Sequence, residues 1–199
     1  MTAEHPSGTV VRPEPRAVAL SLVRVNALDH AASSSPAHGP AEPNWEMHRR
    51  LTRVLERWQA DGTLREDALL LTEWLAVDLV AGLSEQFRDP ARMERWLLDF
   101  GDQVSQGQQH AHPAGPTAIE ILSVVAEEAT ARPSGTAGEE RLARIGAPFL
   151  LYLRDGHELQ DAREVVLTFA LWAGSQLAGL MRNDAGRITA YLDARDNAR

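Results

Sequence analysis

The segment VVLTFALWAGSQLAGLM, from Val165 to Met181, has no charged residue, and no stretch of the chain without one is longer. Its length of about 17 residues is at the lower end of the roughly 17–25 residues that cross a bilayer as a helix. Polar side chains also follow one edge of the helix that it would form: Glu164, Thr168, Ser175 and Arg182. An apolar helix with one narrow polar edge is typical of a bundle core. The segment therefore predicts a central buried helix, over residues 159–183, rather than a membrane span.

Small residues follow a second edge of this helix. Ala170, Gly174 and Ala178 recur at every fourth position, and this spacing lets another helix backbone approach closely. We expect this edge to pack against a second strongly apolar helix, at residues 64–87. A seam between two copies of the chain is the alternative.

The other helices are predicted from apolar periodicity and from their start and stop signals. One start is Asp89 followed by Pro90, because an acid suits the N-cap and proline suits the first helical position. The predicted helices cover residues 44–61, 64–87, 89–107, 117–131, 139–155 and 159–183, with a short helix after 184. No segment offers a convincing partner strand for a sheet. The sequence predicts an all-α fold, an antiparallel bundle of about six main helices with a short C-terminal tail helix.

Composition divides the chain into two parts. Residues 31–43, AASSSPAHGPAEP, have the small and polar composition of a linker. We expect residues 1–43 to be a flexible N-terminal extension that holds at most one short helix, at 17–29. Residues 44–199 then form one bundle domain, which agrees with a total length of 199 residues.

Composition also excludes several chemistries. The chain has no cysteine, and all 20 of its positively charged side chains are arginine. It therefore has neither a thiolate nucleophile nor a catalytic or phosphate-binding lysine. A net charge of −8 argues against a general nucleic-acid binder. The excess of arginine, alanine and glycine is typical of a GC-rich bacterial genome, and we expect a cytoplasmic protein.

One group of residues suggests an internal pocket. Glu73 lies among apolar positions of the helix at 64–87, where a carboxylate either pairs with an arginine or acts as an acid. Tryptophans and the polar edge of the central helix could line a cavity beside it, suited to a small apolar ligand. The candidate lining residues are Glu73, Trp74, Trp96, Trp172 and Ser175.

A second group suggests an interaction surface. Arg49, Arg53 and Arg57 follow the outer face of the helix at 44–61, and Trp45 lies off its apolar stripe. Such a face suits phosphate or an acidic partner helix. Glu56 dilutes the positive charge, so a solvated face is the simpler interpretation.

The histidines do not predict a metal site. His110 and His112 have a spacing that two metal ligands could use, but a zinc or nickel site needs a third ligand and the neighbouring sequence offers none. We expect no metal and no cofactor.

The chain also lacks the standard hydrolase motifs, G-x-S-x-G and His-Glu-x-x-His. Trp45, Leu98 and Leu151 are apolar residues that lie off the buried stripes of their helices, as residues of a partner surface would. We therefore expect a non-enzymatic interaction or regulatory module that forms a homodimer. The alternative is a bundle with an internal pocket for a small apolar ligand, serving as an effector-binding domain or an unusual enzyme.

Overall fold

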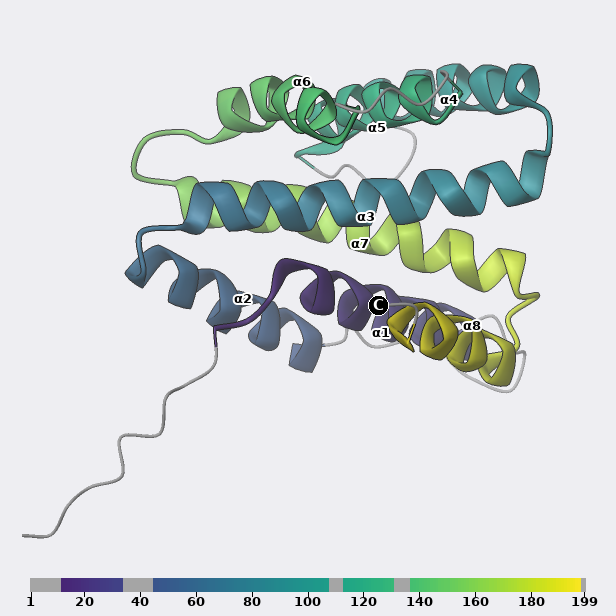
Figure 1. Cartoon of the computed structure of the whole chain (residues 1–199), viewed down its shortest axis with the longest axis horizontal. Helices are drawn as coiled ribbons and strands as arrows, with labels where there is room; N and C mark the ends of the chain where they lie inside the picture. Colours follow the sequence, from purple (N-terminus) through teal and green to yellow (C-terminus); the bar gives the residue numbers. More distant parts are fainter. Residues whose placement is uncertain (1–11, 34–44, 108–112, 131–136, 198–199) are drawn as a thin grey trace, which may run out of the picture.

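The computed structural model describes residues 12–33, 45–107, 113–130 and 137–197, and all the regular secondary structure in this part of the chain is helical (Figure 1). Its eight helices are α1 (Pro15–Ser33), α2 (Trp45–Ala60), α3 (Leu64–Phe87), α4 (Pro90–Ser105), α5 (Gly115–Thr130), α6 (Ala137–Tyr152), α7 (Glu158–Leu180) and α8 (Ala185–Asn197). The all-α prediction is confirmed. The six predicted main helices correspond to α2–α7, and the tail helix corresponds to α8.

The helices form three layers. α3 and α7 lie in the middle, α4, α5 and α6 lie on one side of them, and α1, α2 and α8 lie on the other (Figure 1). The middle pair supplies the largest buried side chains of the core together with α2, α5, α6 and α8. The fold is therefore built around α3 and α7, which are the two longest of the described helices.

The two central helices run parallel to each other. Arg65, at the start of α3, pairs with Glu158 at the start of α7, with 3.2 Å between nitrogen and oxygen. Near the other end, the Gln176 amide of α7 donates a hydrogen bond to Gln86 of α3. The antiparallel prediction does not hold for this pair, because three helices intervene and the chain reverses four times between α3 and α7. It does hold for neighbours in sequence such as α4 and α5 (Figure 1).

The small-residue edge of α7 packs against α1. A Cβ atom at Gly174 would lie 2.9 Å from the backbone nitrogen of Ala27 and closer still to Asn26. The predicted close packing is thus present, but its partner is α1 and not α3. Ala170 and Ala178, on the same edge, are fully buried.

The polar edge of α7 does not form a cleft. The Thr168 hydroxyl donates to the Glu164 carbonyl oxygen at 2.8 Å, and the Ser175 hydroxyl donates to the Trp172 carbonyl oxygen at 3.1 Å. Each hydroxyl is therefore satisfied by its own helix.

Within the described ranges, no single helix has the length and apolar character of a membrane span. Helices α7 and α8 reach that length and apolar character only when they are taken together, and the pair is bent by 116°.

The first helix belongs to the bundle, which corrects the predicted boundary at residue 44. The short helix expected at 17–29 lies within α1, and α1 buries Leu22, Val23 and Ala27 against the core. Asn26 stands on the same buried stripe, and its amide donates to the Leu22 carbonyl oxygen at 2.8 Å. The remainder of the predicted flexible extension, residues 1–11 and 34–44, lies outside the described residues.

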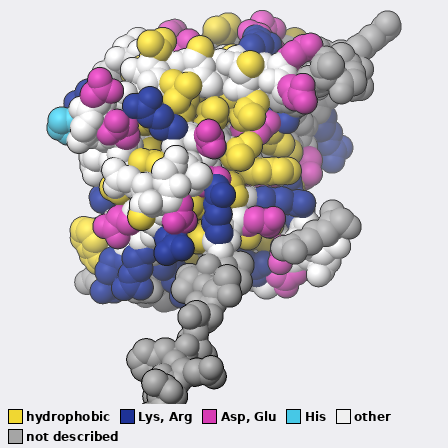
Figure 2. Space-filling model, turned by 60° about the vertical axis from the view of Figure 1, so that its left-hand side comes forward, with side chains coloured by type: hydrophobic (Ala, Val, Ile, Leu, Met, Phe, Trp, Pro, Cys, Tyr) yellow, Lys and Arg dark blue, Asp and Glu magenta, His cyan; other side chains and the backbone are white. Residues whose placement is uncertain are grey.

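The surface over α2 carries the predicted arginines. Arg49, Arg53 and Arg57 are exposed, and Arg57 pairs with Asp61 at 3.0 Å. In Figure 2, arginine side chains gather near the bottom of the molecule, the side on which α2 lies in Figure 1. Trp45 begins this helix with 63% of its surface exposed. The predicted interaction surface is thus accessible in the isolated chain.

Candidate functional site

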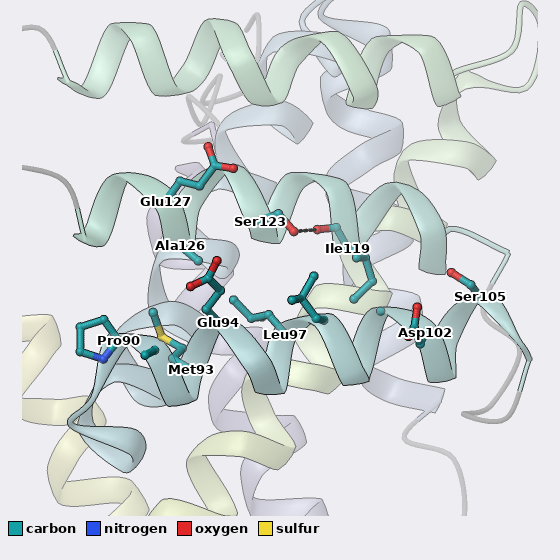
Figure 3. A pocket seen from close by; sticks show the side chains of 13 residues that line it. Pro90, Met93, Glu94, Leu97, Asp102, Ser105, Ile119, Ser123, Ala126 and Glu127 are labelled. Carbon is teal, nitrogen blue, oxygen red and sulfur yellow. Dashed lines mark hydrogen bonds between the residues drawn. The ribbon is translucent and has the colours of Figure 1, made fainter.

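A groove of about 700 Å³ runs between α4 and α5 (Figure 3). Its α4 side extends from Pro90 to Ser105, which is the whole helix, and its α5 side extends from Ile119 to Glu127. An α-helix of 16 residues is about 24 Å long, so the groove is an elongated feature. It lies in the outer layer that is opposite α2 (Figure 1).

The start of α4 is fixed by its sequence. Asp89 accepts a hydrogen bond from the backbone nitrogen of Ala91 at 3.0 Å, and Pro90 follows it at the first helical position. This confirms the predicted start of the helix. One side of α4 then packs inward through Met93, which is buried, while Leu98 points outward with 65% of its surface exposed. The N-cap fixes where α4 begins, and the burial of Met93 fixes which side of the helix faces the core. Together they determine which residues of α4 line the groove.

Helices α4 and α5 approach each other closely at one point along the groove. Gly101 has no side chain opposite Ile119, where a Cβ atom would lie only 3.2 Å from the isoleucine Cγ2 atom. Ala126 and Ser123 line the α5 side, and the Ser123 hydroxyl donates to the carbonyl oxygen of Ile119 at 2.9 Å. Because this hydroxyl is already satisfied, the floor presents mainly apolar surface.

The charged residues that line the groove are all acidic. They are Glu94, Asp102 and Glu127, and none of the described lining residues is basic. Figure 3 shows Glu94 and Asp102 directed from α4 toward the gap, whereas Glu127 points away from it. Glu127 pairs with Arg144 of α6 at 2.6 Å, while Glu94 and Asp102 form no ion pair within the described part of the chain. The groove therefore combines an apolar floor with a negatively charged rim.

The predicted pocket residues do not line this groove. Glu73 forms an ion pair with Arg141 of α6 at 2.7 Å. Of the two alternatives that its position allowed, this is the pairing with an arginine. Arg141 also approaches Glu128 at 3.5 Å, so it joins α3, α5 and α6. Glu73 thus holds the outer layer onto the central one and is not directed into an open cavity as a free acid.

The predicted tryptophans have separate roles. Trp96 stacks on Phe100 with 4.9 Å between ring centres, and Phe100 meets the edge of Trp172 at the same distance. These rings fill the space between α4 and α7 instead of lining a pocket. Trp74 lies elsewhere on α3, with the Arg16 guanidinium 5.1 Å from its ring centre. Ser175 is held by its own helix, as described above, so the five candidates do not converge on one site.

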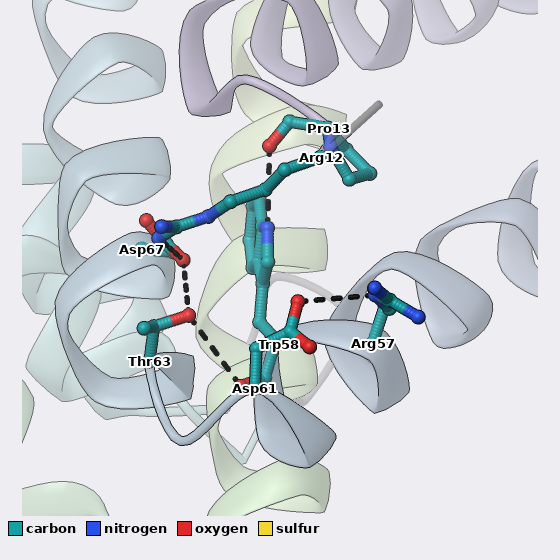
Figure 4. A network of polar contacts seen from close by, with 7 residues as sticks. All are labelled: Arg12, Pro13, Arg57, Trp58, Asp61, Thr63 and Asp67. Carbon is teal, nitrogen blue, oxygen red and sulfur yellow. Dashed lines mark hydrogen bonds and ion pairs between the residues drawn. The ribbon is translucent and has the colours of Figure 1, made fainter. Parts of the chain in front are cut away.

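A polar network joins the start of the described chain to the corner between α2 and α3 (Figure 4). The Arg12 guanidinium pairs with buried Asp67, which also accepts a hydrogen bond from Thr63 at 2.6 Å. The Trp58 indole nitrogen donates to the Pro13 carbonyl oxygen at 3.2 Å. This network attaches residues 12 and 13 to the bundle, so it has a structural role.

A second buried acid holds the turn between α6 and α7. Asp161 is fully buried and accepts hydrogen bonds from the backbone nitrogen of Arg154 at 2.8 Å and from its guanidinium at 2.5 Å. The side-chain hydrogen bonds from Arg154 lower the pKa of Asp161. This pair was not identified from the sequence. The signal that could have identified it is an arginine that precedes a helix by a few residues together with an aspartate in the first turn of that helix.

A metal-binding group is absent from the part of the chain that the structure describes. That part contains no group of three or more His, Asp or Glu side chains placed to hold a metal ion. His110 and His112 lie outside the described residues. Comparisons with protein-family models, with curated proteins and with solved structures found no match to this chain.

Proposed function

We propose that the protein is a non-enzymatic interaction module and that the α4–α5 groove is its recognition surface. The observation that carries the proposal is the apolar, elongated groove beside Leu98, a leucine that the fold leaves exposed. Exposing a large apolar side chain next to an open apolar floor gains nothing for the isolated chain, and such patches mark interaction sites. Leu98 is also one of the off-stripe residues that the sequence assigned to a partner surface.

The shape of the groove favours a helical partner. Two antiparallel helices of about 24 Å form its walls, and a third helix placed along them would bury its apolar face in the way that helix-in-groove complexes do. A small ligand would instead need to be largely enclosed, since ligand pockets bury about 70–90% of a ligand's surface. Exposed residues along the rim, including Leu98, Asp102 and Ser105, leave the groove too open for that.

Leu98→Ser is expected to weaken binding of groove-directed peptides about tenfold, because it removes apolar contact surface worth roughly 1.4 kcal/mol. The measurement is to select peptides that bind the full-length chain from a displayed library of helical sequences, and then to compare affinities for the parent protein and the variant. Leu151→Ser is the matched control, because Leu151 is a leucine of α6 with 85% of its surface exposed that does not line the groove.

Both leucines are exposed, so neither substitution should change the stability of the fold by more than about 0.5 kcal/mol. Peptides that lose affinity with Leu98→Ser and keep it with Leu151→Ser support the proposal. A library that gives no Leu98-dependent binder contradicts it.

The predicted homodimer needs a different surface. A two-fold dimer through the groove would bring Glu94 and Asp102 of both copies together, and like charges at an interface oppose association. We propose that self-association uses the exposed face of α2, where Trp45 offers apolar surface and the presence of both Arg53 and Glu56 lets a two-fold axis bring opposite charges together. Light scattering after size exclusion should give twice the chain mass of 21.9 kDa, and Trp45→Ala should lower it. A monomer at high protein concentration would remove the dimer.

A further inference from the structure

We infer that the groove takes a basic amphipathic helix from another protein, with its apolar face on the floor and its cationic side chains against the acidic rim. This inference rests on the proposed function and adds the chemistry of the partner. It follows from three observations: the sign of the charges that line the groove, the spacing of these charges along α4, and the burial of the apolar stripe of α2 within its own fold.

The sign of the charges selects a cationic partner. Every charged residue that lines the groove carries a carboxylate, and Arg144 neutralises one of the three, Glu127, from the neighbouring helix. Glu94 and Asp102 have no such partner among the described residues. An apolar peptide without positive charge would bring desolvation to these carboxylates and no compensating contact, whereas lysine or arginine side chains at the rim would pair with them.

The spacing of the charges selects an extended partner over a small cation. Glu94 and Asp102 are eight residues apart on α4, which corresponds to about 12 Å along the helix axis. A metal ion needs carboxylates that converge within about 2.6 Å of it. A helix that carries basic residues about two turns apart would meet both acids together while its apolar residues lie on the floor between them.

The helices of this chain are poor candidates for the occupant. The basic helix is α2, but its apolar stripe is already used: Leu51, Leu55 and Trp58 are fully buried in its own fold. A second copy would therefore present arginines without the row of apolar anchors that a groove requires. A basic helix of another chain satisfies both requirements.

The test uses two labelled peptides of 16 residues, the length of α4. Both are amphipathic helices with the same leucine face, and they carry either lysine or glutamate on the polar face. Fluorescence anisotropy with the full-length protein measures their affinities. The lysine peptide is expected to bind and the glutamate peptide is not. Asp102→Asn is expected to weaken binding of the lysine peptide about threefold, as the loss of one partly solvated charge pair does.

Asp99→Asn is the matched control. Asp99 is an exposed acid of the same helix that does not line the groove, so both variants change the net charge by one unit. If Asp99→Asn weakens binding as much as Asp102→Asn, the attraction is a general effect of the acidic chain and the inference is overturned. Equal binding of the glutamate peptide also overturns it.

The library selection separates this inference from the function on which it rests. Selected peptides that depend on Leu98 and are rich in lysine and arginine support both. Selected peptides that depend on Leu98 and are neutral or acidic overturn the basic-helix inference and leave the interaction module standing. The absence of any Leu98-dependent peptide overturns both.

Discussion

Trp58→Ala is expected to destabilise the fold by about 4 kcal/mol, because truncating a fully buried tryptophan leaves a large cavity. The substitution also removes the indole N–H that donates to the Pro13 carbonyl oxygen. For a chain of this length the melting temperature should fall by roughly 8–16 °C. Chemical denaturation followed by circular dichroism measures the free energy of unfolding directly.

Trp45→Ala is the matched control on the same helix. Trp45 is mostly exposed, so in the monomer, measured at low protein concentration, its removal should change the free energy of unfolding by less than about 0.5 kcal/mol. Trp58→Phe removes the N–H group and only part of the ring volume, so its cost should lie between those of the two alanine substitutions. Equal effects of the two alanine substitutions would contradict the packing of α2 described above.

Gly174→Ala is expected to destabilise the fold by about 2 kcal/mol. The added Cβ atom would overlap Asn26 and the backbone of Ala27, and overpacking of this kind costs typically 1–3 kcal/mol or more. Alanine is the better helix former by about 1 kcal/mol, which offsets part of the loss. The measurement is again the free energy of unfolding, taken from denaturant titration.

Gly179→Ala shows the helix-forming effect without the clash. Gly179 lies in the same helix and is exposed, and a Cβ atom there would meet nothing within 4 Å. We expect it to stabilise the fold by about 0.5 kcal/mol. If Gly174→Ala is also stabilising, α1 does not pack on α7 as closely as the structure indicates.

The sequence predicted the helices of the bundle because their apolar periodicity and their caps are local signals. Asp89 and Pro90 begin α4 where they were expected to, and the apolar segment from Val165 to Met181 forms most of the central helix. The role of α1 was missed because its buried stripe is rich in alanine and includes Asn26, so its hydrophobic signal is weak. The partner of Gly174 was missed for the same reason.

The candidate site was much less predictable than the fold. A groove between α4 and α5 depends on which faces of two helices meet, and the sequence of each helix alone does not determine that. The sequence shows Leu98 as an apolar residue off the buried stripe of its helix, but the close approach of Gly101 to Ile119 is seen only when the two helices are packed together. Their residue types alone suggested that Glu73 and the tryptophans line a pocket. In the structure, Glu73 pairs with an arginine and Trp96 stacks on another aromatic ring.

Amide hydrogen exchange is the most direct test that the α4–α5 groove is the recognition surface. The full-length protein is measured alone and with saturating lysine-bearing peptide. The account predicts slowed exchange confined to residues 90–105 and 115–127, the walls of the groove, and a peptide concentration about tenfold higher needed for the same slowing in the Leu98→Ser variant. Slowed exchange over α2, or no local change in spite of binding, would contradict it.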